Sequence, residues 1–455
     1  MTLENWRRGI FFLILIAALQ DPVRKMVPGA PGYLALSIMP VWFVMVARTF
    51  PLYGECWQRF NMHFLKLPRA VKFFFISLIP AALISATYGP GSWQITLVGI
   101  LSYSSLLLGA LTGYMQLSGR GQRLEHIFSV YCLITAVMLV GTPMEYLGVF
   151  DPWGAVGTRS MGTTWLQTSI YGMGLKMIAG FYRSPDVMGW HSVMMSMFAV
   201  LLALKNRGAR RSFWLAVAGW GIVGGMLCGR RKMMYMLPVF VFVLVSFFWR
   251  IHSHRFQFRG VMIIVVSAGL AGYGVYNLVG PNAGVEIYYS NNIVQMSYER
   301  VHTHGVDSVI ETVRQSGFWG EGLGTATQGI HHLRVAKPRT WQEGGLSKIM
   351  VELGVPGFIA ALLMMAALIR SLFHVVHHRV SPESEDFILY AGLVAILCAN
   401  GGSFVVSHQI FGDPFVILFF AFLCGLVLSG ALQGRPIVQR VPVSQGLITS
   451  VKLGS

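Results

Sequence analysis

A succession of long apolar stretches is the feature that most constrains the fold of this chain. About 20 apolar residues cross about 30 Å of hydrocarbon, and about twelve stretches approach that length. Charged residues make up 12% of the 455 residues, whereas a soluble domain carries about 25%. The sequence therefore predicts an all-α, polytopic membrane helix bundle. The predicted spans are residues 9–20, 32–50, 71–88, 94–114, 127–143, 187–204, 213–228, 233–249, 260–279, 347–369, 386–404 and 413–432.

Basic residues predict how the bundle is oriented. When the N-terminus is placed in the cytoplasm and the sides alternate, every cytoplasmic segment carries Lys or Arg. The short outer turns at 88–93 and 401–414 carry none. The positive-inside rule then places both termini in the cytoplasm. Orientation accounts for much of the net charge of +17, so we predict no nucleic-acid partner.

The predicted spans divide the chain into four regions. The first nine spans, with an outer loop at about 144–186, are followed by a large outer loop, three further spans and a short cytoplasmic tail. These regions cover residues 1–279, 280–346, 347–433 and 434–455.

The large outer loop contains a predicted helix and a glycine-rich run. An amphipathic helix of about ten residues is predicted by apolar side chains at helical spacing, namely Val306, Val309, Ile310 and Val313. The run Gly320-Glu321-Gly322-Leu323-Gly324-Thr325 follows. It lacks both the preceding strand and the Lys-Ser/Thr of a nucleotide loop. We expect its glycines to turn the backbone tightly against the membrane helices; contact with substrate is the alternative.

Several basic residues lie on the predicted outer side, against the orientation rule. They include Arg24, Lys25, Arg183, Arg230, Arg231, Lys232, Arg300 and Arg314. Charge near hydrocarbon is costly, so such residues indicate function. For the turn Gly229-Arg230-Arg231-Lys232, one explanation is a phosphate-bearing substrate. The other is that the side chains reach lipid phosphates.

Candidate proton-transfer residues lie on the same side. Glu343 precedes the span that begins near Gly344, where it would either take a proton from a sugar hydroxyl or pair with a nearby cation. Glu352, inside that span, is expected to face protein, with an outer arginine as a candidate partner. The alternative bases are His302, His304, His331 and His332. The sequence has no HExxH and no CxxC, so we predict no metal and no cofactor.

Taken in order, these segments resemble the bacterial O-antigen ligase and polysaccharide polymerase superfamily. The stretch from Ser316 to Thr325 resembles the family's P-x-x-G-x-G-x-G-T-like run. Glu352-Leu353-Gly354-Val355-Pro356-Gly357 resembles its E-x-G-x-x-G. Gly180 to Asp186 resembles G-x-F-x-x-P-N with Asp in the last place, and Gly229-Arg230-Arg231 resembles its S-R turn.

The resemblance implies a metal-independent, GT-C-like glycosyltransferase of the bacterial inner membrane. Such enzymes pass a glycan from an undecaprenyl pyrophosphate carrier to an acceptor glycan or glycolipid at the periplasmic face. The outer arginines would hold the pyrophosphate, and the candidates here are Arg183, Arg230, Arg231, Arg300 and Arg314.

Family ligases carry a His-Asn pair nine residues before the Glu of E-x-G-x-x-G, and this chain has Glu343-Gly344 there. Glu343 is therefore the candidate base, and polymerisation is favoured over ligation. The alternatives are a transporter or flippase for lipid-linked oligosaccharide, and a non-catalytic assembly protein.

Overall fold

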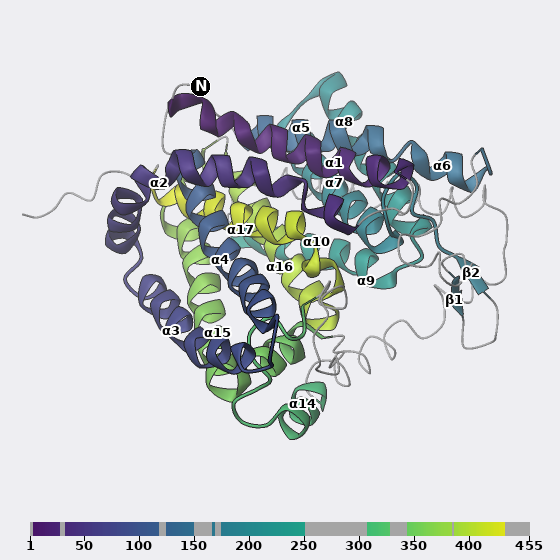
Figure 1. Cartoon of the computed structure of the whole chain (residues 1–455). Coiled ribbons are helices and arrows are strands. Elements are labelled where there is room, and N and C mark those ends of the chain that lie inside the picture. Colours follow the sequence, from purple (N-terminus) through teal and green to yellow (C-terminus); the bar gives the residue numbers. More distant parts are fainter. Residues whose placement is uncertain are drawn as a thin grey trace, which may run out of the picture.

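The chain forms a bundle of helices in the computed structural model (Figure 1). The structure describes residues 3–27, 32–117, 124–149, 166–168, 174–250, 307–327, 344–384 and 386–432. Their elements are η1 (Leu3–Arg8), α1 (Gly9–Met26), η2 (Gly32–Leu36), α2 (Ile38–His63), α3 (Leu67–Ala86), α4 (Ser92–Gln116), α5 (Leu124–Met138), α6 (Gly141–Tyr146), β1 (Leu166–Thr168), β2 (Gly174–Lys176), α7 (Pro185–Lys205), α8 (Gly208–Leu227), α9 (Arg231–Met234), α10 (Met236–Arg250), α14 (Ser308–Ser316), α15 (Gly345–His378), α16 (Phe387–Val406), η6 (Gln409–Gly412), α17 (Pro414–Ser429) and η7 (Gly430–Leu432).

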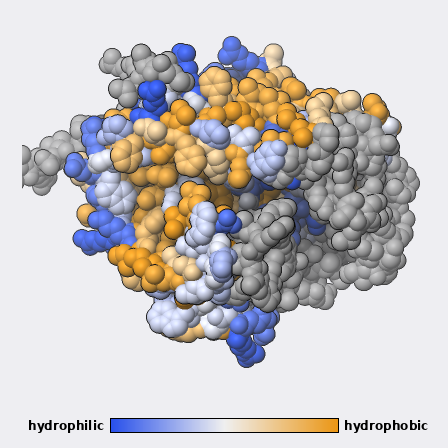
Figure 2. Space-filling model, in the orientation of Figure 1, coloured by the Kyte–Doolittle hydropathy of each residue, from blue (hydrophilic) through white to orange (hydrophobic). Residues whose placement is uncertain are grey.

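Within the described ranges, 8 helical stretches are long and apolar enough to cross a membrane. They lie in α3, α4, α5 with α6, α7, α10, α15, α16 and α17. Hydrophobic side chains also cover much of the surface seen in Figure 2. On α3, Phe73, Ile76, Ile79 and Leu83 recur at helical spacing and are 51–66% exposed. An apolar stripe turned outward on an apolar helix indicates a surface for lipid, so the chain is a multi-pass membrane protein.

Four of the twelve predicted spans are not among these eight. The stretch 9–20 lies in α1, 32–50 is divided between η2 and α2, and 213–228 lies in α8 and the residue after it; α1, α2 and α8 each include charged residues. Asp21, Arg24 and Lys25 lie in the last turns of α1, and Arg210 and Arg211 lie near the start of α8. The predicted span 260–279 lies outside the described residues.

The ends of the helices segregate to two sides of the bundle. On one side, Gln116 at the end of α4 donates to the backbone oxygen of Arg7 at 2.9 Å. Lys205, at the end of α7, lies 3.3 Å from Glu125 at the start of α5 and 2.9 Å from Asp386 before α16. These contacts join segments that the alternating topology places together on the cytoplasmic side.

Two small elements differ from the sequence prediction. The antiparallel pair of β1 and β2 adds two three-residue strands to a bundle predicted as all-α. The predicted amphipathic helix exists as α14, with nine residues, and Thr312 is its only fully buried residue. Ile310 is 53% exposed, whereas Thr312 is buried and Ser308 contacts Ser347 of α15. Val309 and Val313 are half-buried on the face that carries Ser308 and Thr312, so apolar and small polar side chains share the less exposed face.

Candidate functional site: a buried charged cluster

Charged side chains from five separate parts of the chain form two neighbouring ion-pair networks, which residues 183–186 and 407–413 join. They come from the last turns of α1, from α6, from the segment leading into α7, from the α8–α9 turn and from the segment between α16 and α17. We call them the charged cluster, which comprises Asp21, Arg24, Lys25, Glu145, Arg183, Asp186, Arg230, Lys232 and Asp413.

Arg183 joins α1 to α17. Its backbone N–H donates to Asp21 Oδ2 at 3.2 Å, its Nη2 pairs with Asp413 Oδ2, and its Nη1 lies 3.8 Å from Asp21 Oδ1. Burial lowers the pKa of Arg183, but Asp413 and Asp21 raise it by more. The net pKa lies above the ordinary value, so the guanidinium stays charged at any physiological pH.

Asp413 is itself fixed by the helix that follows it. Its Oδ1 accepts from the backbone N–H groups of Phe415 at 2.7 Å and Val416 at 3.2 Å, so it is the N-cap of α17. A carboxylate is favoured at this position because the first N–H groups of a helix have no partner within it. Asp413 therefore holds Arg183 at a set distance from the start of α17.

Asp186, in the first turn of α7, holds the cations of the α8–α9 turn. Its Oδ2 lies 3.0 Å from Nε of Arg230, and its Oδ1 lies 2.7 Å from Nζ of Lys232. Lys232 also donates to Ser407 Oγ at 3.0 Å and to Gln409 Oε1 at 3.3 Å. These bonds connect the start of α7 with α9 and with the segment that carries Asp413.

The backbone preceding Arg183 is held from two directions. Lys25 Nζ donates to the carbonyl oxygen of Gly180 at 2.9 Å. Glu145 Oε2 accepts from the N–H groups of Ala179 at 3.1 Å and Gly180 at 2.6 Å. Gly180 has a φ of +55°, and a Cβ there would lie 2.9 Å from the backbone nitrogen of Thr142. The site therefore requires glycine at this position.

An aromatic layer lies deeper in the bundle, next to the cluster. The ring of His191 stacks on Tyr182 and Phe415 at centroid distances of 5.0 and 5.7 Å. Its Nδ1 lies 2.8 Å from the hydroxyl of Tyr131, and the residue is 6% exposed. His191 is therefore a packed core histidine and is not placed to meet a substrate from solvent.

The charges of the cluster nearly cancel, which the sequence analysis did not predict. Its four carboxylates face five cations. Neither explanation offered for the outer cations, substrate or lipid phosphate, included carboxylate partners. The Asp-Pro pairs at 21–22 and 413–414 were the sequence signal that could have drawn attention to these carboxylates, because Asp before Pro is typical of a helix start. At Asp413 that signal is correct.

The structure brings together some of the predicted site residues. Arg183 and Arg230 both belong to the cluster. Arg231 begins α9, and its side chain is not among those described; Arg300 and Glu343 lie outside the described residues. Arg314 lies on α14 with a side chain 76% exposed, 3.7 Å from Glu311. The convergence of Arg183, Arg300 and Arg314 stays a prediction.

The glycine-rich run and the Glu352–Gly357 segment of α15, which both resemble family motifs, contact each other directly. α15 is broken at Gly354, where φ is +63°. In a regular helix Val355 N–H would donate to Val351 oxygen, but here it donates to Phe318 oxygen at 2.8 Å. Val351 oxygen accepts instead from Glu321 N–H at 2.6 Å. The glycine-rich run is thus inserted into the hydrogen bonding of α15.

The glycines of this run let its backbone touch three helices. A Cβ added at Gly320, Gly322 or Gly324 would lie 2.4–2.6 Å from backbone atoms of Gly354, Ser85 or Ile95. All three have positive φ, between +75° and +97°. The expectation that these glycines turn the backbone tightly against the membrane helices is confirmed.

Glu352 of α15 binds the two residues that follow the glycine-rich run. Its Oε1 accepts from Ala326 N–H at 3.1 Å and from Thr327 Oγ1 at 2.9 Å, and its Oε2 accepts from the Tyr103 hydroxyl at 2.7 Å. The residue is fully buried. It faces protein as predicted, but the partners shown for its carboxylate belong to the loop and to α4, and none is an arginine.

No protein-family model and no curated protein sequence matches this chain. A functional assignment therefore rests on the residues themselves.

Proposed function

We propose that this protein is a membrane glycosyltransferase that moves a glycan from an undecaprenyl pyrophosphate carrier to a sugar hydroxyl at the periplasmic face. The product would be a polysaccharide or O-antigen-like glycan, and the reaction either polymerisation or ligation. The observation that carries the proposal is that Arg183 is held in one ion-pair network and Arg230 with Lys232 in another, and that residues 183–186 and 407–413 join the two networks.

The carboxylates of the cluster favour binding of a diphosphate, because they preorganise the cations. Asp186 fixes Arg230, and Asp21 with Asp413 fixes Arg183. The side chains of Arg230 and Arg183 are still 24% and 16% exposed. A guanidinium held in one orientation loses little entropy when it binds a phosphate group with two hydrogen bonds. The nearly balanced charge also lets the site exist without substrate at a tolerable electrostatic cost.

In the proposal, Glu343 is the general base. The loop segment that contains it follows Thr327, which Glu352 holds, and precedes Gly344 at the start of α15. Both ends of that segment are thus tied to the same helix. An acceptor arriving from the periplasm would meet the membrane-bound donor at this border.

Release of undecaprenyl pyrophosphate by the purified protein in nanodiscs tests the proposal. With lipid-linked glycan and acceptor, the wild type is expected to release the carrier as the glycan lengthens. Arg230→Lys keeps the charge but loses the planar fork, so we expect a fall in rate of at least tenfold. Arg59→Lys, at an exposed ion pair on α2, is the control. Glu343→Gln should abolish turnover while donor binding persists.

The outcomes separate the classes of protein. Movement of intact lipid-linked glycan across the bilayer of liposomes that contain the protein, without carrier release, would support a flippase and contradict the transferase. If Arg230→Lys turned over at the wild-type rate, the charged cluster would not be the site that binds the pyrophosphate. Wild-type turnover by Glu343→Gln would move the base to one of the outer histidines.

A further inference from the structure

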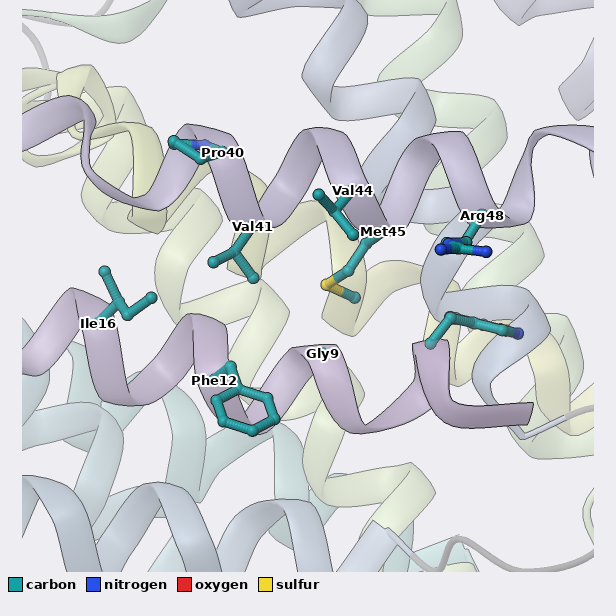
Figure 3. A pocket seen from close by; sticks show the side chains of 9 residues that line it. Gly9, Phe12, Ile16, Pro40, Val41, Val44, Met45 and Arg48 are labelled. Atoms are coloured by element: carbon teal, nitrogen blue, oxygen red, sulfur yellow. The ribbon is translucent and has the colours of Figure 1, made fainter. Parts of the chain in front are cut away.

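A groove between α1 and α2 lies apart from the charged cluster. Its volume is about 390 Å³, and Figure 3 shows side chains of both helices turned toward it. The lining residues are Trp6, Gly9, Phe12, Ile16, Pro40, Val41, Val44, Met45 and Arg48. All of them except Arg48 are apolar or aromatic, so the groove fits an alkyl chain.

The groove is narrow at one point and open along one side. At Gly9 an added Cβ would lie 2.6 Å from Met45 Cγ, so the two helices touch there. Phe12 and Val44 are each 53% exposed, and therefore the groove opens at the surface of the bundle. Gly9 and Ile16 are seven residues apart on α1, a length of about 10 Å.

One end of the groove carries a cation. Arg48 is exposed and forms no ion pair within the described part of the chain. Trp6, three residues before Gly9, also lines the groove, and the guanidinium of Arg7 lies 5.7 Å from its ring centroid. Tryptophan and arginine together are typical of the border between hydrocarbon and lipid headgroups. The groove therefore has an apolar body and a positively charged border.

We propose that this groove binds one acyl chain of an anionic membrane phospholipid, with the lipid phosphate at Arg48. Acyl methylenes would cover the apolar lining, and the phosphodiester would pair with the guanidinium. Arg48 lies level with the start of α1, while the charged cluster contains residues of the last turns of α1. A carrier pyrophosphate at the cluster would thus lie toward the opposite side of the membrane. The proposal does not depend on the proposed function.

Native mass spectrometry tests this proposal with phosphatidylglycerol and phosphatidylcholine of equal chain length. The wild type, purified in detergent and mixed with both lipids, is expected to retain one phosphatidylglycerol in preference to phosphatidylcholine. Arg48→Gln should lower that preference about fivefold, the effect of one cation at a lipid surface. Arg59→Gln removes the same charge from α2 outside the groove and should leave the preference unchanged.

A larger side chain in the groove distinguishes lipid binding in the groove from a general effect of the protein surface. Val44→Trp should reduce retention of both lipids, whereas Val137→Trp, at another exposed valine on α5, should not. Equal retention of the two lipids by the wild type would overturn the proposal. So would an Arg48→Gln preference equal to that of Arg59→Gln, or unchanged retention in Val44→Trp. Unaltered thermal unfolding of Val44→Trp will verify that the variant folds.

Discussion

At the scale of single residues, the buried charges are neutralised by partners from distant parts of the chain. Arg183 is 162 residues from Asp21 and 230 residues from Asp413 along the sequence. Each of these carboxylates is at most 3% exposed. Loss of the cation would leave two buried carboxylates without their ion pair, which is more costly than loss of an exposed pair.

We therefore predict that Arg183→Ala lowers the free energy of unfolding by about 3 kcal/mol. Arg59→Ala breaks an exposed pair and should cost less than about 1 kcal/mol. Thermal and denaturant unfolding of the purified proteins in detergent measures both. The double variant Arg183→Ala/Asp413→Asn should lose less stability than the sum of its single changes. Strict additivity would show that the pair seen in the structure contributes nothing.

Glu352 offers a second residue-scale prediction, which separates a structural carboxylate from a catalytic one. Glu352→Gln keeps an oxygen for Ala326 and Thr327 and supplies an NH₂ that donates to Tyr103, so stability and turnover should stay near wild type. Glu352→Ala leaves three buried donors without an acceptor and should cost about 1–3 kcal/mol for each. Loss of turnover in a stable Glu352→Gln protein would instead assign the carboxylate a chemical role.

At the scale of elements, the glycine-rich run and the broken helix α15 form one unit. Gly354 lets α15 open, and the run supplies the backbone partners that the opened turn has lost. Glu352, two residues before the break, binds the end of the same run. The two segments that resemble family motifs are therefore two halves of one contact.

We expect this contact to be sensitive to a single added methyl group. Gly322→Ala places a Cβ 2.6 Å from the backbone nitrogen of Ser85, at a φ of +97°. Gly91→Ala has a similar φ of +86° but no atom within 4 Å. The Gly91 change should cost about 1 kcal/mol of backbone strain, and the Gly322 change clearly more. Measurements of the free energy of unfolding of both variants test this prediction. Equal losses of stability would show that the glycine-rich run is not closely packed.

The sequence predicted the apolar helices well because their signal is local. A run of apolar side chains marks a span wherever it stands, as for α3 and α17. The first span was predicted to end at residue 20, whereas α1 continues through charged residues to Met26. In α14 the predicted stripe is buried only in part: Val309 and Val313 are half-buried, whereas Ile310 is exposed.

At the scale of the whole molecule, folding collects five charged segments on one side of the bundle. The sequence indicated which cations were unusual and predicted that they share one side. It did not indicate their partners, since Asp21, Glu145 and Asp413 are single residues far apart in the chain. Pairing of this kind depends on the packing of whole helices, which an individual sequence does not encode in any short pattern.

The proposed function requires that the charged cluster lie at the periplasmic face. Cysteine labelling tests it in a background from which the five native cysteines have been removed. Leu147→Cys, next to α6, and Trp319→Cys, in the glycine-rich loop, probe the cluster side at exposed positions. Arg207→Cys and Glu383→Cys probe the exposed turns on the other side.

A membrane-impermeant maleimide added to intact cells with a permeable outer membrane is the direct measurement. We predict that positions 147 and 319 are labelled at once, and that positions 207 and 383 are labelled only after the inner membrane is opened. Labelling of 207 and 383 in intact cells, with 147 and 319 protected, would place the charged cluster in the cytoplasm and exclude a periplasmic transferase.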